Sequence, residues 1–170
     1  MKNLLLISIL FLSINIFSQT AQEWYEKGNG NWALEDYSGA IADYSKAIEL
    51  DPKFAMAYLY RGYSRARLAD YRGAISDITK AAELDPKNKN PDYYYTRGNW
   101  KANIKEYSSA IADYTKAIVI DPKYAEAYYN RGFYKIKLND TDIDGACLDF
   151  SKAGELGLAI AYNAIREYCN

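Results

Sequence analysis

The side chains that most often do chemistry in proteins are scarce in this 170-residue chain. Histidine is absent, which excludes imidazole bases, histidine triads and most zinc and iron sites. The sequence has no glycine-rich phosphate loop and no cysteine spacing typical of a metal site. The stretch DTDID, with Asp142 and Asp144, begins like a calcium loop, but the glycine and the closing glutamate are not at the required spacing. We therefore expect no enzyme activity, no cofactor and no metal, and we interpret this acid pair as part of a solvated turn.

The two cysteines, Cys147 and Cys169, can form a disulfide if the protein works in an oxidising compartment. Gly157 is suited to end a helix between them, ten residues after Cys147 and twelve before Cys169. With a rise of roughly 1.5 Å per residue, an antiparallel helical hairpin that turns there brings both cysteines to similar heights. This geometry predicts a disulfide, and two buried, inert thiols are the alternative.

Residues 1–18 are predicted to be a signal peptide. Lys2 supplies a short positive start, and the apolar stretch 4–17 is too short to span a bilayer comfortably, which takes about 20 residues. Ser18 offers a cleavage site, and no cysteine stands there to carry a lipid anchor. The segment is similar to export signals of Bacteroidetes-type bacteria, which implies an exported bacterial protein of the periplasm or extracellular space, with no membrane span after cleavage. An uncleaved signal anchor is the alternative.

The composition indicates a globular protein that does not bind nucleic acid. Apolar residues make up 49% of the chain and charged residues 25%, which is typical of a folded domain. Lys and Arg number 21 against 22 Asp and Glu. This balance, without a local basic run, gives no electrostatic reason to expect a nucleic-acid partner.

An aromatic-x-x-basic-Gly pattern occurs four times, as WYEKG at 24–28, YLYRG at 58–62, YYTRG at 94–98 and YYNRG at 128–132. The glycines are 34, 36 and 34 residues apart. About twelve residues after each glycine comes a second pattern, AIADYSKA, AISDITKA, AIADYTKA or ACLDFSKA. Its apolar residues recur with the spacing of one helical face, and Asp-Pro ends the first three units. The sequence therefore predicts repeated pairs of helices.

A period of 34 residues with aromatic, Gly, Ala and Pro at these offsets resembles the tetratricopeptide repeat from residue 21 to about residue 157. The resemblance implies an all-α fold, a right-handed α-solenoid of four tetratricopeptide helix pairs plus a C-terminal capping helix. We place the units at 21–54, 55–88, 91–124 and 125–158, and the capping helix at 159–170. Helices are expected at 21–33, 37–50, 54–68, 71–84, 91–103, 107–120, 125–138, 142–155 and 158–168.

Small residues recur where the two helices of a unit must cross closely. We expect each glycine of the first pattern to pack against the alanine that opens the second pattern of the same unit. The glycines are Gly28, Gly62, Gly98 and Gly132, and the alanines are Ala40, Ala74, Ala110 and Ala146.

A basic residue precedes each of these glycines, where members of the family usually carry leucine. It recurs together with an aspartate in the second helix, which predicts an ion pair, either within a unit or across the next interface. The alternative is a ladder of arginines that binds an anionic ligand, although the aspartates would neutralise it. The basic residues are Lys27, Arg61, Arg97 and Arg131, and the aspartates are Asp43, Asp77, Asp113 and Asp149.

The first helix of each unit lines a concave groove in tetratricopeptide arrays, so the resemblance implies that an unidentified protein or peptide binds there. The groove positions differ between units and are rich in Tyr, which offers large contact area, and Asn, which can bond an extended backbone. Packing of some of these tyrosines against adjacent first helices is the alternative. The predicted partner-binding residues are Tyr25, Asn29, Leu59, Tyr60, Tyr63, Tyr95, Thr96, Asn99, Tyr129, Asn130 and Phe133.

Family members that clamp chaperone C-termini carry lysine, asparagine and arginine at set groove positions. The matching positions here are Tyr25, Asn29, Tyr60, Asp92 and Thr96, of which only Asn29 fits, and Asp92 would repel a carboxylate. The prediction is thus a non-catalytic scaffold or adaptor that does not capture acidic C-terminal tails. Two alternatives stay open, namely a solenoid that self-associates through its terminal helix or convex face, and glycan binding by the tyrosine-rich groove.

Overall fold

The computed structural model describes residues 19–85, 90–138 and 142–169, and within these ranges it contains nine α-helices and no strand. The predicted signal peptide and residues 86–89 and 139–141 lie outside the described residues. The helices are α2 (Ala21–Ala33), α3 (Tyr37–Leu50), α4 (Ala55–Arg67), α5 (Tyr71–Leu84), α6 (Pro91–Asn103), α7 (Tyr107–Ile120), α8 (Ala125–Lys137), α9 (Ile143–Glu155) and α10 (Ala161–Tyr168).

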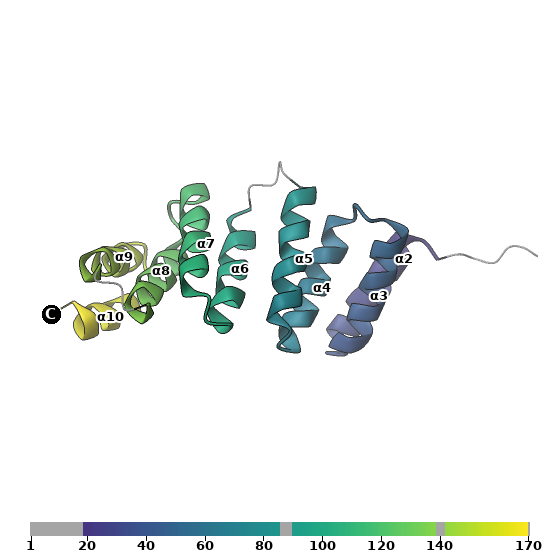
Figure 1. Cartoon of the computed structure of the whole chain (residues 1–170), viewed down its shortest axis with the longest axis horizontal. Coiled ribbons are helices and arrows are strands. Elements are labelled where there is room, and N and C mark those ends of the chain that lie inside the picture. Colours follow the sequence, from purple (N-terminus) through teal and green to yellow (C-terminus); the bar gives the residue numbers. More distant parts are fainter. Residues whose placement is uncertain (1–18, 86–89, 139–141, 170) are drawn as a thin grey trace, which may run out of the picture.

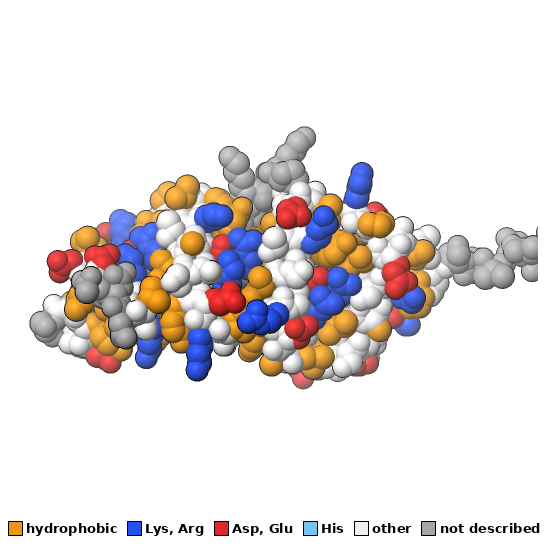
Figure 2. All heavy atoms as spheres, in the orientation of Figure 1, with side chains coloured by type: hydrophobic (Ala, Val, Ile, Leu, Met, Phe, Trp, Pro, Cys, Tyr) orange, Lys and Arg blue, Asp and Glu red, His pale blue; other side chains and the backbone are white. Residues whose placement is uncertain are grey.

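The helices pack in sequence order, as Figure 1 shows. Pairs α2–α3, α4–α5, α6–α7 and α8–α9 form the units, each second helix packs on the next first helix, and α10 packs on α9. The prediction of an all-helical solenoid of four pairs plus a capping helix is confirmed. In the orientation of Figure 2, acidic, basic and apolar side chains are mixed across the surface, with no extended area of one charge.

The expected helix ends lie within one residue of the observed ones, with one exception. The last helix begins at Ala161 and not at residue 158. Gly157 has a φ of 98°, and the amide of Ala161 donates to the carbonyl oxygen of Leu158 at 3.0 Å. The chain therefore makes an additional turn before α10 starts.

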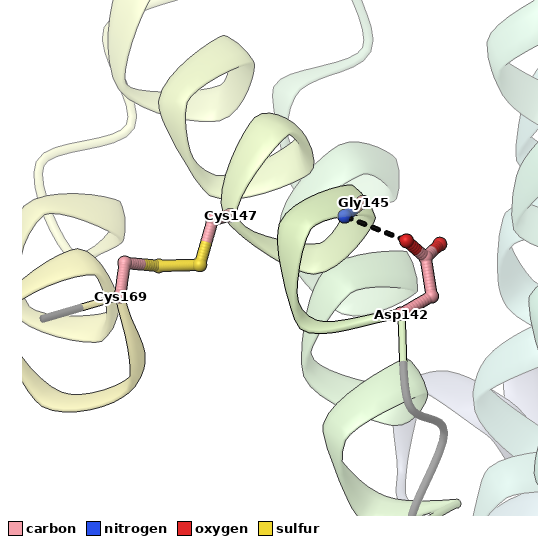
Figure 3. Close-up of a disulfide and its surroundings, with 4 residues drawn as sticks. All are labelled: Asp142, Gly145, Cys147 and Cys169. Carbon is pink, nitrogen blue, oxygen red and sulfur yellow. Dashed lines mark hydrogen bonds between the residues drawn. A yellow bond between two sulfur atoms is a disulfide. The ribbon is translucent and has the colours of Figure 1, made fainter.

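Three of the second helices begin with the same cap, an aspartate whose carboxylate accepts a hydrogen bond from the glycine amide three residues on. In α9, Asp142 accepts from Gly145 at 2.8 Å (Figure 3). A Cβ at Gly145 would collide with that carboxylate, which explains why glycine stands there. Asp142 thus caps α9, whereas Asp144 lies in the first turn of that helix and not in the expected turn between the helices.

The glycines of the first pattern pack in two different ways. At Gly62 and Gly132 a Cβ would come within 3.3 and 2.9 Å of the carbonyl oxygens of Ala74 and Ala146, as predicted. At Gly28 and Gly98 the prediction is wrong, because a Cβ there would meet a tyrosine ring, that of Tyr44 at 2.6 Å or Tyr114 at 2.8 Å. In these two units the tyrosine ring of the second helix lies over the glycine, at the point where the two helices cross.

Replacing Gly98 by alanine tests this packing. The new methyl would press on the ring of Tyr114, which is fully buried and cannot move aside. We expect Gly98→Ala to lower the free energy of unfolding by about 1–3 kcal/mol, as overpacking does. Urea unfolding followed by circular dichroism measures the change.

Gly30 is the matched control, because it also lies inside a first helix but a methyl group added there would meet nothing within 4 Å. Gly30→Ala should raise the free energy of unfolding by up to about 1 kcal/mol through helix propensity alone. Stabilisation by both substitutions would contradict the packing described for Gly98.

Candidate functional site

A buried aspartate lies at the centre of each helix pair, and the basic residue before the glycine binds it. The four aspartates are only 2–4% exposed. Arg97 holds Asp113 with two hydrogen bonds, from Nε at 2.8 Å and from Nη2 at 2.6 Å. The same two bonds join Arg61 to Asp77 and Arg131 to Asp149, and Lys27 binds Asp43 at 3.0 Å. The predicted ion pair is confirmed in all four units.

A second side chain, one helical turn further along the first helix, also contacts each carboxylate. Lys101 lies 2.7 Å from Asp113, and the corresponding donors are Arg65 at 2.8 Å from Asp77, Lys135 at 3.3 Å from Asp149 and Asn31 at 2.7 Å from Asp43. These donors were not among the residues predicted from the sequence. Their signal was the second basic residue four positions after each arginine, which lies on the same helix face.

The arginines also connect neighbouring units. Arg97 donates to the hydroxyl of Thr79 in the preceding second helix at 3.1 Å, and Arg61 and Arg131 do the same to Ser45 and Thr115. Each guanidinium lies over the ring of the tyrosine three residues earlier, at 5.4–5.5 Å. Because carboxylate, hydroxyl and ring surround these guanidinium groups, the structure gives no support to an arginine ladder for anions.

The cations lower the pKa of the buried carboxyl group of Asp113. Burial raises this pKa, but hydrogen bonds and charge from Arg97 and Lys101 outweigh burial and hold it below its ordinary value. Conversely, the hydrogen bond to Asp113 raises the pKa of Arg97. The pair is therefore ionised at neutral pH.

The predicted groove residues lie on α2, α4, α6 and α8, and ten of the eleven are partly exposed. The exception is Leu59, which is 8% exposed and packs in a core cluster with Ile78 and Trp100. Its side chain serves the core and offers little surface to a partner.

The N-terminal half of the candidate groove is a chain of aromatic rings. The Tyr25 ring lies 5.0 Å from that of Phe54 and 5.9 Å from that of Tyr60, and the Tyr60 ring lies 6.1 Å from that of Tyr63. Burial raises the pKa of Tyr25 and Tyr63, so both hydroxyls keep their protons and can donate hydrogen bonds. The tyrosines thus pack on one another, as the alternative interpretation expected, while part of each ring remains accessible.

The C-terminal half adds a network of amides. Asn130 donates from Nδ2 to the Tyr95 hydroxyl at 3.2 Å and to Oδ1 of Asn99 at 3.0 Å, which joins two units. Oδ1 of Asn99 also accepts from the Tyr114 hydroxyl at 2.8 Å. These bonds hold the amides in fixed orientations.

One of these contacts recurs with a period of two units. The Tyr44 hydroxyl donates to Asn29 at 2.8 Å, just as the Tyr114 hydroxyl donates to Asn99 seventy residues later. The position of Asn130, however, has no matching amide in the N-terminal half, because Tyr60 stands there. The hydrogen bond from the buried tyrosine to the groove asparagine therefore recurs, whereas the neighbouring groove residue differs between the two halves.

Charged side chains lie near the ends of the first helices and are not among the predicted groove residues. Asp92, at the start of α6, accepts a hydrogen bond from the Tyr124 hydroxyl at 2.7 Å. At the other end of the first helices, Lys137 lies over the Phe133 ring at 5.3 Å and Arg67 over the Tyr37 ring at 5.0 Å. Acidic groups at helix starts and basic groups at helix ends also suit the helix dipoles.

Two further properties of the described residues bear on the site. Across 19–85, 90–138 and 142–169, no group of three or more His, Cys, Asp or Glu side chains is arranged to hold a metal ion. In the same part of the chain, no helix combines the length and the apolar character that crossing a membrane requires.

Comparison with known proteins finds the same repeat. Residues 28–68 and 104–137 match the family model described as TPR repeat. A solved structure of MamA from Desulfovibrio magneticus RS-1 superposes with a TM-score of 0.72 at 23% identity, covering 80% of this chain and 75% of that one. This likeness concerns the fold alone. No match was found among curated proteins.

Two solved TPR domains are also similar. The Arabidopsis OM64 TPR domain has a TM-score of 0.62 and 27% identity, covering 69% of this chain and 96% of that one. The first TPR of Spaghetti (RPAP3), solved with the HSP90 peptide SRMEEVD, has a TM-score of 0.64 and 26% identity, covering 75% of this chain and 99% of that one.

The depressed pKa of Asp113 predicts how stability depends on pH. Ionised Asp113 stabilises the folded state above the ordinary carboxyl pKa of about 3.9, and this contribution is lost as the pH falls through the lower folded-state value. Asp113→Asn should therefore lower stability at pH 7 and flatten the loss of stability below about pH 4. Urea unfolding at a series of pH values measures both effects.

Glu49→Gln is the control, since Glu49 forms only an exposed ion pair with Lys46. It should leave both the stability at pH 7 and the acid profile close to wild type. An Asp113→Asn variant with the wild-type acid dependence would contradict the role given to this carboxylate.

Proposed function

We propose that this chain is a tetratricopeptide-repeat scaffold or adaptor without catalytic activity, which binds a peptide or protein segment along α2, α4, α6 and α8. A comparison of the residues that stay the same in all four units with those that differ supports the proposal. The aspartates and their cations recur in every unit and are paired inside the fold. The residues that differ between units are the partly exposed rings and amides of the first helices, where partner choice can reside.

The observation that carries the proposal is the fixed orientation of the groove amides. Asn130 bridges Tyr95 and Asn99 across the boundary between α6 and α8. Side chains held in place before binding lose little conformational entropy when a partner arrives. Tyrosine adds a large contact area with few rotatable bonds, and asparagine can pair with an extended backbone.

The RPAP3 structure supports the mode of binding and not the ligand. That TPR domain holds the acidic HSP90 peptide SRMEEVD. In this chain the positions of the family's carboxylate clamp carry Tyr25, Tyr60, Asp92 and Thr96 beside a single matching Asn29. We infer that the partner segment is not an acidic C-terminus, because Asp92 would repel it and the predicted groove residues carry no positive charge.

An exported protein fits these features. The disulfide between Cys147 and Cys169 is of the kind that persists in oxidising compartments. The apolar N-terminal segment has the pattern of a signal peptide. We propose that the protein works in the periplasm or outside the cell.

A pull-down from a cell-envelope extract tests the proposed groove. The bait is the wild-type protein or the variant Tyr60→Ala plus Tyr95→Ala, which removes one ring from each half of the groove. We expect a partner that the wild type retains and that the variant binds at least about tenfold more weakly, as truncation of aromatic anchors does. Titration of the purified partner measures the ratio.

The control variant is Val119→Ala plus Leu148→Ala, two side chains on the second helices that are 75% and 71% exposed. It should bind like the wild type, and circular dichroism should show all three proteins folded. Identical partners and affinities for wild type and groove variant would argue against the groove. Recovery of the protein's own chain alone would favour the self-associating solenoid instead.

A further inference from the structure

The second helix of the last unit differs from the others at one inward position. Ile41, Ile75 and Ile111 open the second pattern of the first three units after its alanine, and Cys147 takes that place in the fourth. Cys147 is bonded to Cys169 at the end of α10, with 5.8 Å between their Cα atoms (Figure 3). The cysteine therefore stands where the other units carry an apolar side chain.

In the fourth unit that position faces the end of α10, because Cys147 is bonded to Cys169 there. Ile75 packs against a core cluster that contains Tyr93 and Trp100, both of the next unit's α6. The disulfide therefore joins α9 to the end of α10 at the position where the other units carry a partly buried isoleucine.

The capping helix has few fully buried side chains. It is eight residues long, its start has no side-chain cap, and its buried residues are two alanines, Ala161 and Ala164. A helix this short is unstable in water without tertiary support. Two alanine methyls bury little apolar area, so the attachment of α10 depends on its partly buried side chains and on the disulfide.

The capping helix covers the end of the core beside the candidate groove. Ile165, Tyr168 and Cys169 pack on a cluster centred on Phe150, which is fully buried. The Tyr168 ring lies 6.2 Å from that of Phe150, and the groove residue Tyr129 lies on Phe150 as well, with its ring at 5.6 Å. Removal of α10 would expose Phe150 and free one side of this cluster.

We propose that the Cys147–Cys169 disulfide is a redox-controlled clasp, whose reduction releases α10 from the end of the solenoid and uncovers Phe150 while the four repeats stay folded. The reductant is a dithiol. One of its sulfurs attacks a disulfide sulfur to form a mixed disulfide, and its second thiol displaces the protein sulfur. The dithiol is oxidised to a disulfide, and its two protons pass to the cysteines. Both cysteines are partly exposed, so a reductant can reach them.

Hydrogen exchange with mass spectrometry tests the clasp on the full chain, with and without dithiothreitol. Reduction should accelerate amide exchange in 161–168 by about a hundredfold. This is the size of effect expected when the loop closed by the Cys147–Cys169 disulfide is no longer held closed. The helices of all four repeats, α2 to α9, should keep their protection. Cys147→Ser plus Cys169→Ser should exchange rapidly in 161–168 under both conditions.

Cys147→Ile plus Cys169→Ala is the matched variant, because it restores the isoleucine of the other repeats. Its exchange in 161–168 should not respond to dithiothreitol. Unchanged exchange of the wild type on reduction would overturn the proposal, as would free thiols in the protein before reduction or equal acceleration along the whole chain. None of these measurements requires a partner, so the clasp and the proposed groove stand or fall separately.

Discussion

The buried carboxylate in each unit is the constraint on which the rest of the solenoid depends. An ionised aspartate that is almost fully removed from water is costly unless several donors surround it. Here Asp113 receives Nε and Nη2 of Arg97 and the ammonium group of Lys101. Because both cations come from one face of the first helix, the carboxylate fixes the rotation of that helix. The outward face is then determined as well, and it carries the tyrosines and asparagines of the candidate groove.

The same interaction connects the units. The arginine that binds its own aspartate also reaches a hydroxyl of the preceding second helix, as Arg97 does with Thr79. The array is therefore held by polar contacts that recur in register and by aromatic packing that differs between units. Gly28 and Gly98 lie under tyrosine rings, Gly62 lies against a backbone carbonyl, and Gly132 lies against both a carbonyl and the Phe150 ring. At the end of the array, the disulfide adds a covalent attachment of α10 to α9.

Much of this architecture could be predicted from the sequence, because a period repeated four times gives the helices and their ends in register. The ion pair was also predictable, since a basic residue and an aspartate recur together in every unit. The second donor, Lys101, is less evident from the sequence, because the corresponding position in the first unit holds Asn31, which is not basic. The burial of Leu59 and the ring over Gly98 depend on the sizes of side chains that meet across an interface, which no single pattern contains. The partner cannot be predicted from the sequence, because the fold indicates how a ligand binds but does not identify it.

A double-mutant cycle on Arg97 and Asp113 tests most directly whether the buried pair organises the fold. The four proteins are wild type, Arg97→Met, Asp113→Leu and the double variant, each unfolded in urea at pH 7. The account predicts that the double variant loses less stability than the sum of the single losses, with a coupling of at least about 2 kcal/mol, because each single change leaves a buried charge with fewer partners. Losses that add to within about 0.5 kcal/mol would show that the two residues act independently, and would contradict the account.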